Sequence, residues 1–228
     1  MHTVCINLPV FFLSKTPRLL ENLGFVPLGK DLLGQTLLSD GEVMIRLDAE
    51  SEYGAGILYF SENMPSMPLG QMASDEAEAD WAREWKSPEG VSLSMLYATA
   101  DTVPDYSPAG ELPYGKFYEV SLMTTDFSDS LVWWMKAGFE LTYGDPETGS
   151  FVTLSDGKIR VGLYKPGSCP HIFNNPAVTY FDPSMKEKIA KAREAGILFA
   201  QEIPDKTGEV VDAIIETEEG WHIFLFTA

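Results

Sequence analysis

Cysteine, histidine and basic residues are scarce in this chain of 228 residues. It has two cysteines, three histidines and 16 Lys or Arg residues against 34 Asp or Glu residues, which leaves a formal net charge of −18. Because such a charge repels nucleic-acid phosphates and anionic lipid headgroups, we expect neither nucleic acid nor a membrane as a partner. The two cysteines, Cys5 and Cys169, lack a CxxC spacing, which argues against a disulfide framework or a zinc site built on thiols alone.

Long apolar segments are also missing. The apolar run over residues 4–13 is interrupted by Asn7 and Pro9, and it lacks the basic start and the cleavage site of a signal peptide. No segment is long and apolar enough to cross a bilayer. We therefore expect a cytoplasmic protein with reduced thiols. The sequence contains no phosphate-binding glycine loop, no Ser-His-Asp order and no zinc-protease motif.

The chain contains an internal repeat. Residues 21–25 (ENLGF), 36–47 (TLLSDGEVMIRL) and 55–60 (AGILYF) correspond to residues 135–139 (MKAGF), 152–163 (VTLSDGKIRVGL) and 176–181 (PAVTYF). The displacement grows slowly, from 138 − 24 = 114 through 155 − 39 = 116 to 180 − 59 = 121. Short loop insertions explain such a drift, so the two segments are interpreted as copies of one structural unit.

Each copy predicts the local order β-α-β-β-β. An alternating run predicts a strand over residues 3–10 and 117–124, and helical periodicity follows it up to the Gly-Phe pair, where glycine favours a helix C-cap. Two further strands then meet at Ser-Asp-Gly, whose Asp-Gly dipeptide is typical of a tight hairpin.

A second unit follows each copy. After the strand at 177–181, Ser184 and Glu187 form a predicted capping box for a helix up to Gly196, and strands follow at 210–215 and 221–227. The corresponding second unit in the N-terminal half is shorter, and we expect in it a strand at 54–60, a helix at 75–86 and a strand at 91–98.

Laid out in this way, the chain resembles the vicinal oxygen chelate superfamily, which includes glyoxalase I, extradiol dioxygenases, fosfomycin-resistance enzymes and bleomycin-resistance proteins. The resemblance rests on residues 119–126 (EVSLMTTD), on Gly138-Phe139 twelve residues later, and on the turns at 87–90 (SPEG) and 218–220 (EEG). It implies an α+β fold in which tandem βαβββ modules form curved mixed sheets around clefts, with helices outside.

The resemblance also divides the chain. It implies an N-terminal half at 1–103 with module 1 and a degenerate module 2, a connecting loop at 104–116, and a C-terminal half at 117–228 with modules 3 and 4. Four modules in one chain would imitate the dimer of two-module relatives, so both a monomer and a homodimer remain open.

Family enzymes hold a divalent metal with side chains from the first and last strands of modules. The matching first-strand positions carry Cys5, Gly56, Glu119 and Ala177, and the last-strand positions carry Arg46, Ser94, Gly162 and Phe224. Only Glu119 is a plausible ligand there, and His222 is the one histidine on an inward strand position. Because a catalytic site needs at least three converging ligands, we expect no metal and no other cofactor.

Strand alternation predicts which polar and aromatic side chains point into the clefts. Arg46 could clamp a carboxylate or phosphate, or form an internal ion pair with Glu42 or Asp48. Glu119 could act as a general base or bind a cation, or it could bond to Arg160 or Tyr118. The candidate ligand-binding residues are Arg46, Ser94, Glu119, Ser121, Arg160, Thr179, His222 and Phe224.

Other reactive or bulky residues are interpreted as structural. His222 could titrate near neutral pH, but a lone strand histidine is typically a satisfied structural residue. Cys5 has no histidine at catalytic spacing, which disfavours a nucleophile. In the Trp133-Trp134 pair we expect one ring in the core and the other partly exposed.

Three functions remain open at this stage, and whether the chain is an enzyme is undecided. The first is a metal-free protein that binds a small organic molecule, as bleomycin-resistance proteins do. The second is a metal-dependent lyase, isomerase or dioxygenase of the same superfamily, whose ligands would be found in a different register. The third is a structural or interaction module with clefts filled by side chains such as Phe224 and Phe226.

Overall fold

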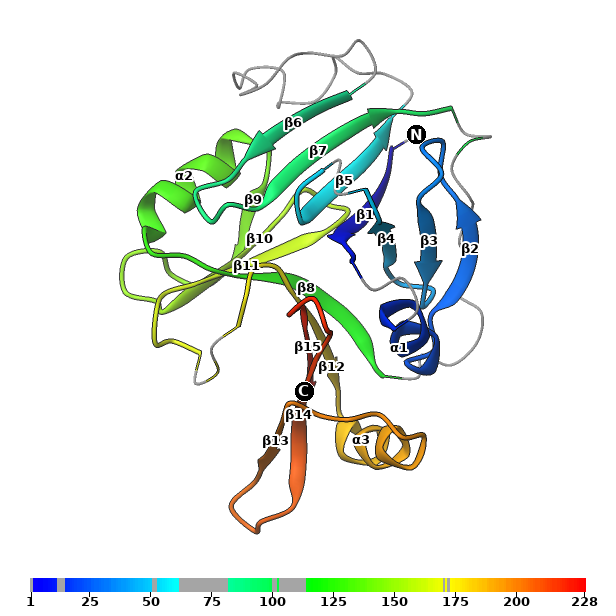
Figure 1. Cartoon of the computed structure of the whole chain (residues 1–228). Coiled ribbons are helices and arrows are strands. Elements are labelled where there is room, and N and C mark those ends of the chain that lie inside the picture. Colours follow the sequence, from blue (N-terminus) through cyan, green and yellow to red (C-terminus); the bar gives the residue numbers. More distant parts are fainter. Residues whose placement is uncertain are drawn as a thin grey trace.

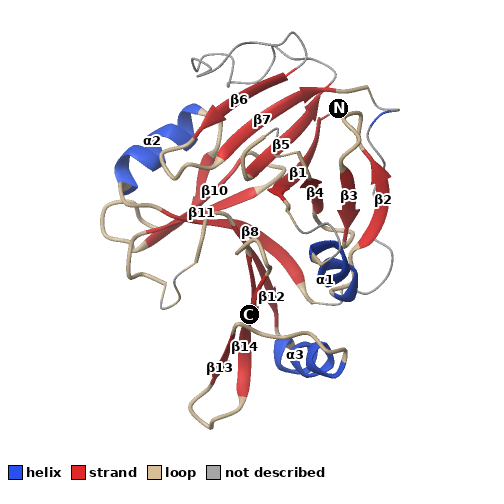
Figure 2. Cartoon of the chain, viewed as in Figure 1, coloured by secondary structure: helices blue, strands red, loops and turns tan. Residues whose placement is uncertain are grey.

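The computed structural model describes residues 2–11, 15–50, 53–61, 82–99, 102, 114–169, 171 and 173–228. These residues form two mixed β-sheets and three helices (Figures 1 and 2). Among the described helices, none combines the length and apolar character needed to span a bilayer. The predicted α+β class is confirmed.

Sheet A is built from the N-terminal part of the chain, with α1 (Thr16–Asn22) between its first two strands. The strand order among the described residues is β2-β3-β4-β1-β5-β7-β6. The bounds are β1 (His2–Pro9), β2 (Val26–Lys30), β3 (Thr36–Ser39), β4 (Met44–Asp48), β5 (Gly56–Ser61), β6 (Ala82–Lys86) and β7 (Ser92–Tyr97).

Sheet B is built from the C-terminal part, with α2 (Phe127–Lys136) and α3 (Met185–Glu194). Its order is β13-β14-β15-β12-β8-β11-β10-β9. The bounds are β8 (Lys116–Met123), β9 (Glu140–Tyr143), β10 (Phe151–Ser155), β11 (Arg160–Tyr164), β12 (Ala177–Asp182), β13 (Gln201–Pro204), β14 (Val210–Glu216) and β15 (His222–Thr227).

The two sheets share one pairing pattern, which confirms the predicted tandem modules. In sheet A, the first strands β1 and β5 of two modules pair antiparallel, and each pairs parallel with its own last strand, β4 or β7. In sheet B, β8 and β12 pair antiparallel, and each pairs parallel with β11 or β15. Each sheet therefore consists of two modules joined through their first strands.

The predicted helix over 75–86 is wrong where the structure can test it. Residues 75–81 lie outside the described part, but residues 82–86 form strand β6, in which Trp85 pairs with Leu93 of β7. Burial of the Trp85 ring in the shared core and the hydrogen-bonded ladder outweigh the helix propensity of the Ala, Arg and Glu residues in this segment.

The boundary assigned to the connecting loop also needs one correction. Residues 104–113 lie outside the described part, and Lys116, which was assigned to the loop, begins β8 and pairs with Phe181 of β12.

The predicted C-cap glycines of two helices are confirmed, whereas the predicted capping box of α3 is wrong. Gly24 and Gly138 follow α1 and α2 with φ of 86° and 97°, the left-handed conformation predicted for C-cap glycines. The predicted capping box of α3 does not form. Its Ser184 hydroxyl donates to the Asp182 carboxylate at 2.6 Å instead of accepting from the first turn.

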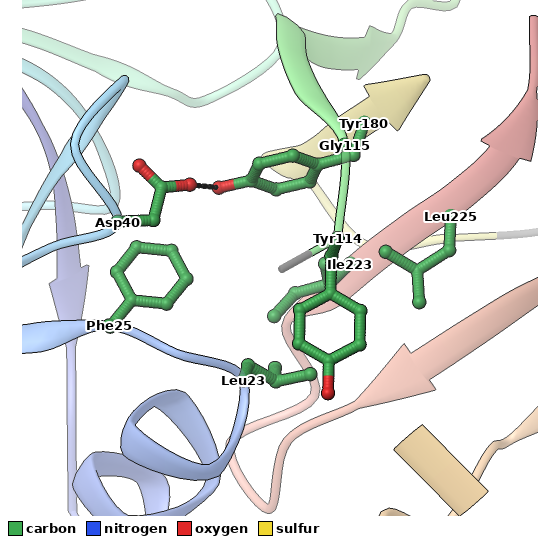
Figure 3. A pocket seen from close by; sticks show the side chains of 8 residues that line it. All are labelled: Leu23, Phe25, Asp40, Tyr114, Gly115, Tyr180, Ile223 and Leu225. Atoms are coloured by element: carbon green, nitrogen blue, oxygen red, sulfur yellow. Dashed lines mark hydrogen bonds between the residues drawn. The ribbon is translucent and has the colours of Figure 1, made fainter. Parts of the chain in front are cut away.

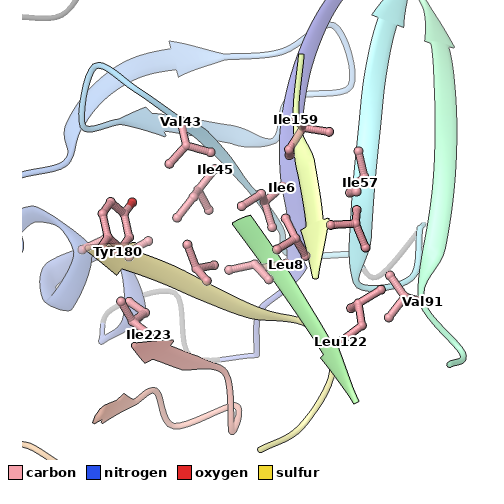
Figure 4. Packing of buried hydrophobic residues seen from close by; sticks show 14 of the residues in the cluster. Ile6, Leu8, Val43, Ile45, Ile57, Val91, Leu122, Ile159, Tyr180 and Ile223 are labelled. Atoms are coloured by element: carbon pink, nitrogen blue, oxygen red, sulfur yellow. The ribbon is translucent and has the colours of Figure 1, made fainter. Parts of the chain in front are cut away.

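The main hydrophobic core lies between the two sheets. Figure 4 shows Ile6, Ile45 and Ile57 from sheet A facing Leu122 and Tyr180 from sheet B. The helices pack on the same side, and Trp134 of α2 is fully buried while Trp133 is only partly buried, as expected. Because alternate strand residues enter this core, the other side chains of each strand lie on the opposite face of their sheet.

Contacts between the halves also involve turns. The Trp134 indole donates to Glu89 in the β6–β7 turn, and the Thr16 hydroxyl of α1 donates to Glu219 in the β14–β15 turn. Figure 3 shows a third contact, in which the Tyr180 hydroxyl donates to Asp40 at 2.7 Å. The small cavity beside it has a volume of about 10 Å³, which leaves room for no more than a water molecule.

Candidate functional site

The strongest candidate site lies on the face of sheet B that is turned away from the shared core. Glu119 of β8 pairs in register with Thr179 of β12, and Thr179 pairs with Phe224 of β15. In the neighbouring row, Ser121 and His222 flank Ala177. We call this surface the Glu119 face, defined by Glu119, Ser121, Thr179, His222 and Phe224. The structure thus brings five of the eight predicted residues together.

Glu119 is completely buried and bonded to hydroxyl groups. Its carboxylate accepts hydrogen bonds from the Tyr164 hydroxyl at 2.6 Å, the Ser121 hydroxyl at 3.0 Å and the Thr153 hydroxyl at 3.2 Å. The predicted alternatives, bonds to Arg160 or Tyr118, are not formed. Arg160 donates to the backbone carbonyls of Tyr118 and Phe117 instead, whereas Thr153 and Tyr164 reach the carboxylate from the neighbouring strands β10 and β11.

Space for this carboxylate comes from Gly162 of β11. A methyl group at Gly162 would overlap the Glu119 carboxylate. Tyr164 and Thr153 were missed by sequence reasoning, although a signal was available. Tyr164 stands two residues after Gly162 on β11, and Thr153 pairs with Gly162 across the β10–β11 ladder, so period-two alternation places both on the same face.

The pKa of Glu119 is raised, because burial disfavours the charged carboxylate. Hydrogen bonds from Tyr164, Ser121 and Thr153 and the charge of Arg160 act in the opposite direction but do not cancel the effect of burial. The pKa of Tyr164 is also raised, first by burial and then by the neighbouring Glu119 charge, so its hydroxyl remains a donor. Glu119 and Tyr164 can therefore hold a proton between them and donate it in a hydrogen bond to a bound group.

His222 lies on this face with a structural partner. Its Nδ1 accepts a hydrogen bond from the Asn174 amide at 3.4 Å, which agrees with a neutral, structurally satisfied ring. Burial lowers the pKa of His222, which also favours the neutral imidazole.

Aromatic rings form the apolar part of the Glu119 face. Phe224 stacks on Phe226 at 5.2 Å between centroids and meets Phe173 edge-on at 5.1 Å. Phe181 lies 6.1 Å from Phe226 and 5.1 Å from Tyr118. Three of these rings, Phe181, Phe226 and Tyr118, are only partly buried, so the aromatic surface reaches solvent.

The candidates on sheet A are separate from this cluster. Arg46 is fully buried, and its Nε contacts Asp31 at 2.6 Å while Nη1 contacts Asp48 at 3.2 Å and Asn7 at 2.7 Å. The predicted internal ion pair with Asp48 is therefore present, Asp31 was missed, and Glu42 is not a partner.

Ser94 and Cys5 lie on the same face of sheet A as Arg46. Ser94 Oγ is buried without a hydrogen bond to the described residues. Burial raises the pKa of the Cys5 thiol, which disfavours a nucleophilic role.

Arg160 is the first residue of β11 and lies apart from the hydrogen bonds of Glu119. Its Nε donates to the Tyr118 carbonyl at 2.6 Å, and its guanidinium lies 4.4 Å from the centroid of the Tyr118 ring. It lines a separate cavity of about 200 Å³ beside the β10–β11 turn.

The residues present do not fit a catalytic divalent metal. No group of three or more His, Cys, Asp and Glu side chains converges within the described part of the chain. Around Glu119, the in-register neighbours are Thr179 and Phe224, and three protein hydroxyls already bind the carboxylate. A metal that requires at least three protein ligands finds at most two candidate donors on this face, Glu119 and His222.

Comparison with solved structures identifies the fold. A catechol 2,3-dioxygenase matches with a TM-score of 0.59 and 13% identity, over 98% of this chain and 86% of its own. Homoprotocatechuate 2,3-dioxygenase from Arthrobacter globiformis matches with 0.59 and 10%, over 98% and 78%. The enzyme from Brevibacterium fuscum, in complex with 3,4-dihydroxyphenylacetate, matches with 0.60 and 12%, over 98% and 83%.

No protein-family profile matches the chain, and no curated protein matches it significantly. At identities of 10–13%, the structural matches speak for the fold alone. The chain has the tandem-module fold of the vicinal oxygen chelate superfamily, and the predicted resemblance is confirmed at that level.

Proposed function

We propose that this protein binds a small organic molecule at the Glu119 face without a catalytic metal. One observation carries the proposal: a fully buried carboxyl group that makes no ion pair within the described residues and lies among aromatic rings. Burial of an ionisable group is costly unless other interactions compensate, so the presence of a buried carboxyl group beside aromatic rings supports a binding role.

The chemistry of the face defines the ligand class. A carboxylate favours a protonated amine or another strong hydrogen-bond donor, such as a phenol, and the rings of Phe224 and Phe226 favour a flat apolar body. Tyr164 bonds to Glu119 and is itself partly exposed, so a ligand donor that replaces the Tyr164 hydroxyl would reach the carboxylate. The net charge of −18 also favours a cation over an anion at this face.

A ligand screen followed by one substitution tests the proposal. We expect small aromatic amines or phenols to raise the thermal midpoint, because a ligand that binds only the folded state stabilises it. Glu119→Gln, which keeps the size of the side chain, should weaken this binding by about tenfold or more. The exposed Glu140 on β9 offers a control, since Glu140→Gln makes the same change away from the Glu119 face.

The comparisons by themselves favour a second function, a metal-dependent enzyme of the dioxygenase type. Two of the similar structures that cover 98% of this chain are described as 2,3-dioxygenases. Against it stands the lack of a third converging donor beside Glu119 and His222 within the described residues. Elemental analysis of the purified protein separates the two: stoichiometric iron, manganese, nickel or zinc would replace the first proposal by the second.

A third function, a structural module with a filled face, is supported by the complete burial of Glu119 and Phe224. If no amine or phenol shifts the thermal midpoint and no metal copurifies, this third function replaces the other two.

A further inference from the structure

The face of sheet A that is turned away from the shared core carries two buried polar atoms without a partner. Nη2 of Arg46 and Oγ of Ser94 make no hydrogen bond within the described residues, although the two residues are only 0% and 1% exposed. A buried donor that lacks an acceptor costs free energy, so each such group in a folded protein calls for an explanation. A bound molecule with acceptor oxygens would satisfy both atoms.

Strand pairing places the two atoms on one surface. Arg46 of β4 pairs in register with Asn7 of β1. On β7, Ser94 pairs with Leu58 of β5, which in turn pairs with Cys5 of β1. Because Cys5 and Asn7 are two residues apart, Arg46 and Ser94 lie in adjacent rows of the same face, separated by β1 and β5 (Figure 1). We call this surface the Arg46 face, defined by Cys5, Asn7, Arg46, Leu58 and Ser94.

The Arg46 guanidinium is fixed by its other two nitrogens. Nε contacts Asp31 at 2.6 Å, and Nη1 contacts Asn7 at 2.7 Å and Asp48 at 3.2 Å. The guanidinium carbon lies 5.6 Å from the centroid of the Tyr53 ring. Since these contacts hold the group in one orientation, Nη2 can bind an acceptor with little further loss of conformational entropy.

The charges on the Arg46 face disfavour an anion. Among the described residues, Arg46 supplies one positive charge, whereas Asp31 and Asp48 supply two negative charges in contact with it. A second pair, Glu84 and Lys86 of β6, is joined at 2.7 Å and adds no net charge. An anion at Nη2 would place a third negative charge beside the two aspartates, so a neutral acceptor is favoured.

The rest of the Arg46 face is apolar. Cys5, Leu58 and Phe60 belong to one buried apolar cluster. Burial raises the pKa of the Cys5 thiol, which therefore stays uncharged. These side chains favour a ligand with an apolar body, whose polar atoms would lie at Arg46 and Ser94.

The repeat gives the two sheets opposite chemistry at equivalent positions. Cys5 of the first copy corresponds to Glu119 of the second, and Arg46 corresponds to Gly162. Sheet B therefore has a buried acceptor at this place, and sheet A has a buried donor. We expect the two faces to bind molecules of different hydrogen-bonding character.

We propose that the Arg46 face is a second binding site, for a neutral molecule with an apolar body and two acceptor oxygens, one bound by Arg46 Nη2 and the other by the Ser94 hydroxyl. Ketones, ethers and uncharged amides belong to this class, whereas carboxylates and phosphates do not. The site goes beyond the function proposed for the Glu119 face, because it lies on the other sheet and takes hydrogen-bond acceptors instead of donors.

Titration calorimetry with para-methoxyacetophenone tests the site, because this neutral ketone carries an acceptor oxygen at each end of a flat ring. We expect saturable binding. The analogue in which a methylene group replaces the carbonyl oxygen has nearly the same shape without the strong acceptor, and it should bind about tenfold more weakly. The anion para-methoxybenzoate should also bind more weakly than the ketone, because of the two aspartates beside Arg46.

Substitutions test the protein side of the same contacts. Ser94→Ala removes one donor and should weaken ketone binding by roughly three- to tenfold. Ser128→Ala makes the same change at an exposed position of α2 and should leave ketone binding unchanged. Arg46→Lys would remove Nη2 but would also disturb the buried ion pairs. The comparison of the ketone with its methylene analogue therefore tests Arg46 in the unaltered protein.

The proposal is overturned if the ketone does not saturate, if the methylene analogue or the benzoate binds as tightly as the ketone, or if Ser94→Ala and Ser128→Ala behave alike. Glu119→Gln should leave ketone binding unchanged, and a loss of ketone binding in that variant would also overturn the proposal. Binding of amines or phenols should persist in Ser94→Ala. Failure of one proposal is therefore distinguishable from failure of the other.

Discussion

The Tyr59 hydroxyl donates a hydrogen bond to Asp156 at 2.8 Å, which repeats the bond from Tyr180 to Asp40 on the other side of the same interface. Tyr59 and Tyr180 occupy equivalent positions of β5 and β12, and the two aspartates occupy equivalent Ser-Asp-Gly turns. Each half therefore donates a tyrosine hydrogen bond to the Ser-Asp-Gly hairpin turn of the other half. This reciprocity explains why both copies retain a Tyr and a Ser-Asp-Gly turn.

Removal of either hydroxyl should destabilise the protein. We expect Tyr59→Phe and Tyr180→Phe each to lower the free energy of unfolding by about 1–3 kcal/mol, because each leaves a partly buried carboxylate without one donor. Since the two bonds share no residues, their effects should add in the double variant. Urea denaturation measures them, and Tyr143→Phe, with an exposed ring on β9, is the control. Losses no larger than the control would show that the bonds do not stabilise the interface.

Arg46 should prove essential for stability. Arg46→Met leaves Asp31 and Asp48 buried without their cation, and we expect a loss of roughly 3–5 kcal/mol in the free energy of unfolding. Arg193→Met removes an exposed arginine–glutamate pair with Glu202 and should cost less than about 1 kcal/mol. If both variants lost equal stability, the Arg46 cluster would not be a structural ion network.

Glu119 should make stability depend on pH in a defined direction. The raised pKa means that the folded state keeps the proton at pH values where the unfolded chain has released it. The stability that this group contributes is full below the ordinary glutamate pKa of about 4.3 and is lost as the pH rises through the folded pKa.

Glu119→Gln removes this titration. We therefore expect the variant to gain stability relative to the parent chain as the pH rises above about 4.3, and the gain to level off above the folded pKa. Denaturation curves at several pH values measure the difference, and Glu140→Gln on the exposed strand β9 should show no comparable trend. A difference that is constant with pH contradicts the raised pKa.

Gly162 should be intolerant of a side chain because of Glu119. Gly162→Ala would force the carboxylate out of its position, and we expect a loss of about 1–3 kcal/mol in the free energy of unfolding. In a Glu119→Ala background the same substitution should cost much less. A cost that is equal in both backgrounds would assign the effect to the backbone rather than to the overlap.

Much of the fold and part of the candidate site can be predicted from local patterns in the sequence. The repeat, the Ser-Asp-Gly turns and the Gly-Phe helix ends led to tandem modules, and period-two alternation placed Glu119, Ser121 and Thr179 on one face. The same reasoning failed for residues 82–86, where helix-favouring residues form β6 because β7 offers a ladder and a place for Trp85.

The face of the sheet on which a strand side chain lies is determined by the few residues around it, because successive side chains alternate between the faces and turn glycines adopt their own backbone angles. The side chains that a strand residue contacts on that face depend on the register and on which strands pair within the sheet. The partners of Arg46 at Asp31, of Glu119 at Tyr164 and of Tyr180 at Asp40 stand 15, 45 and 140 residues away. Alternation alone therefore determined the faces of the sheets, and only the packed structure decided which charges and hydroxyls meet on them.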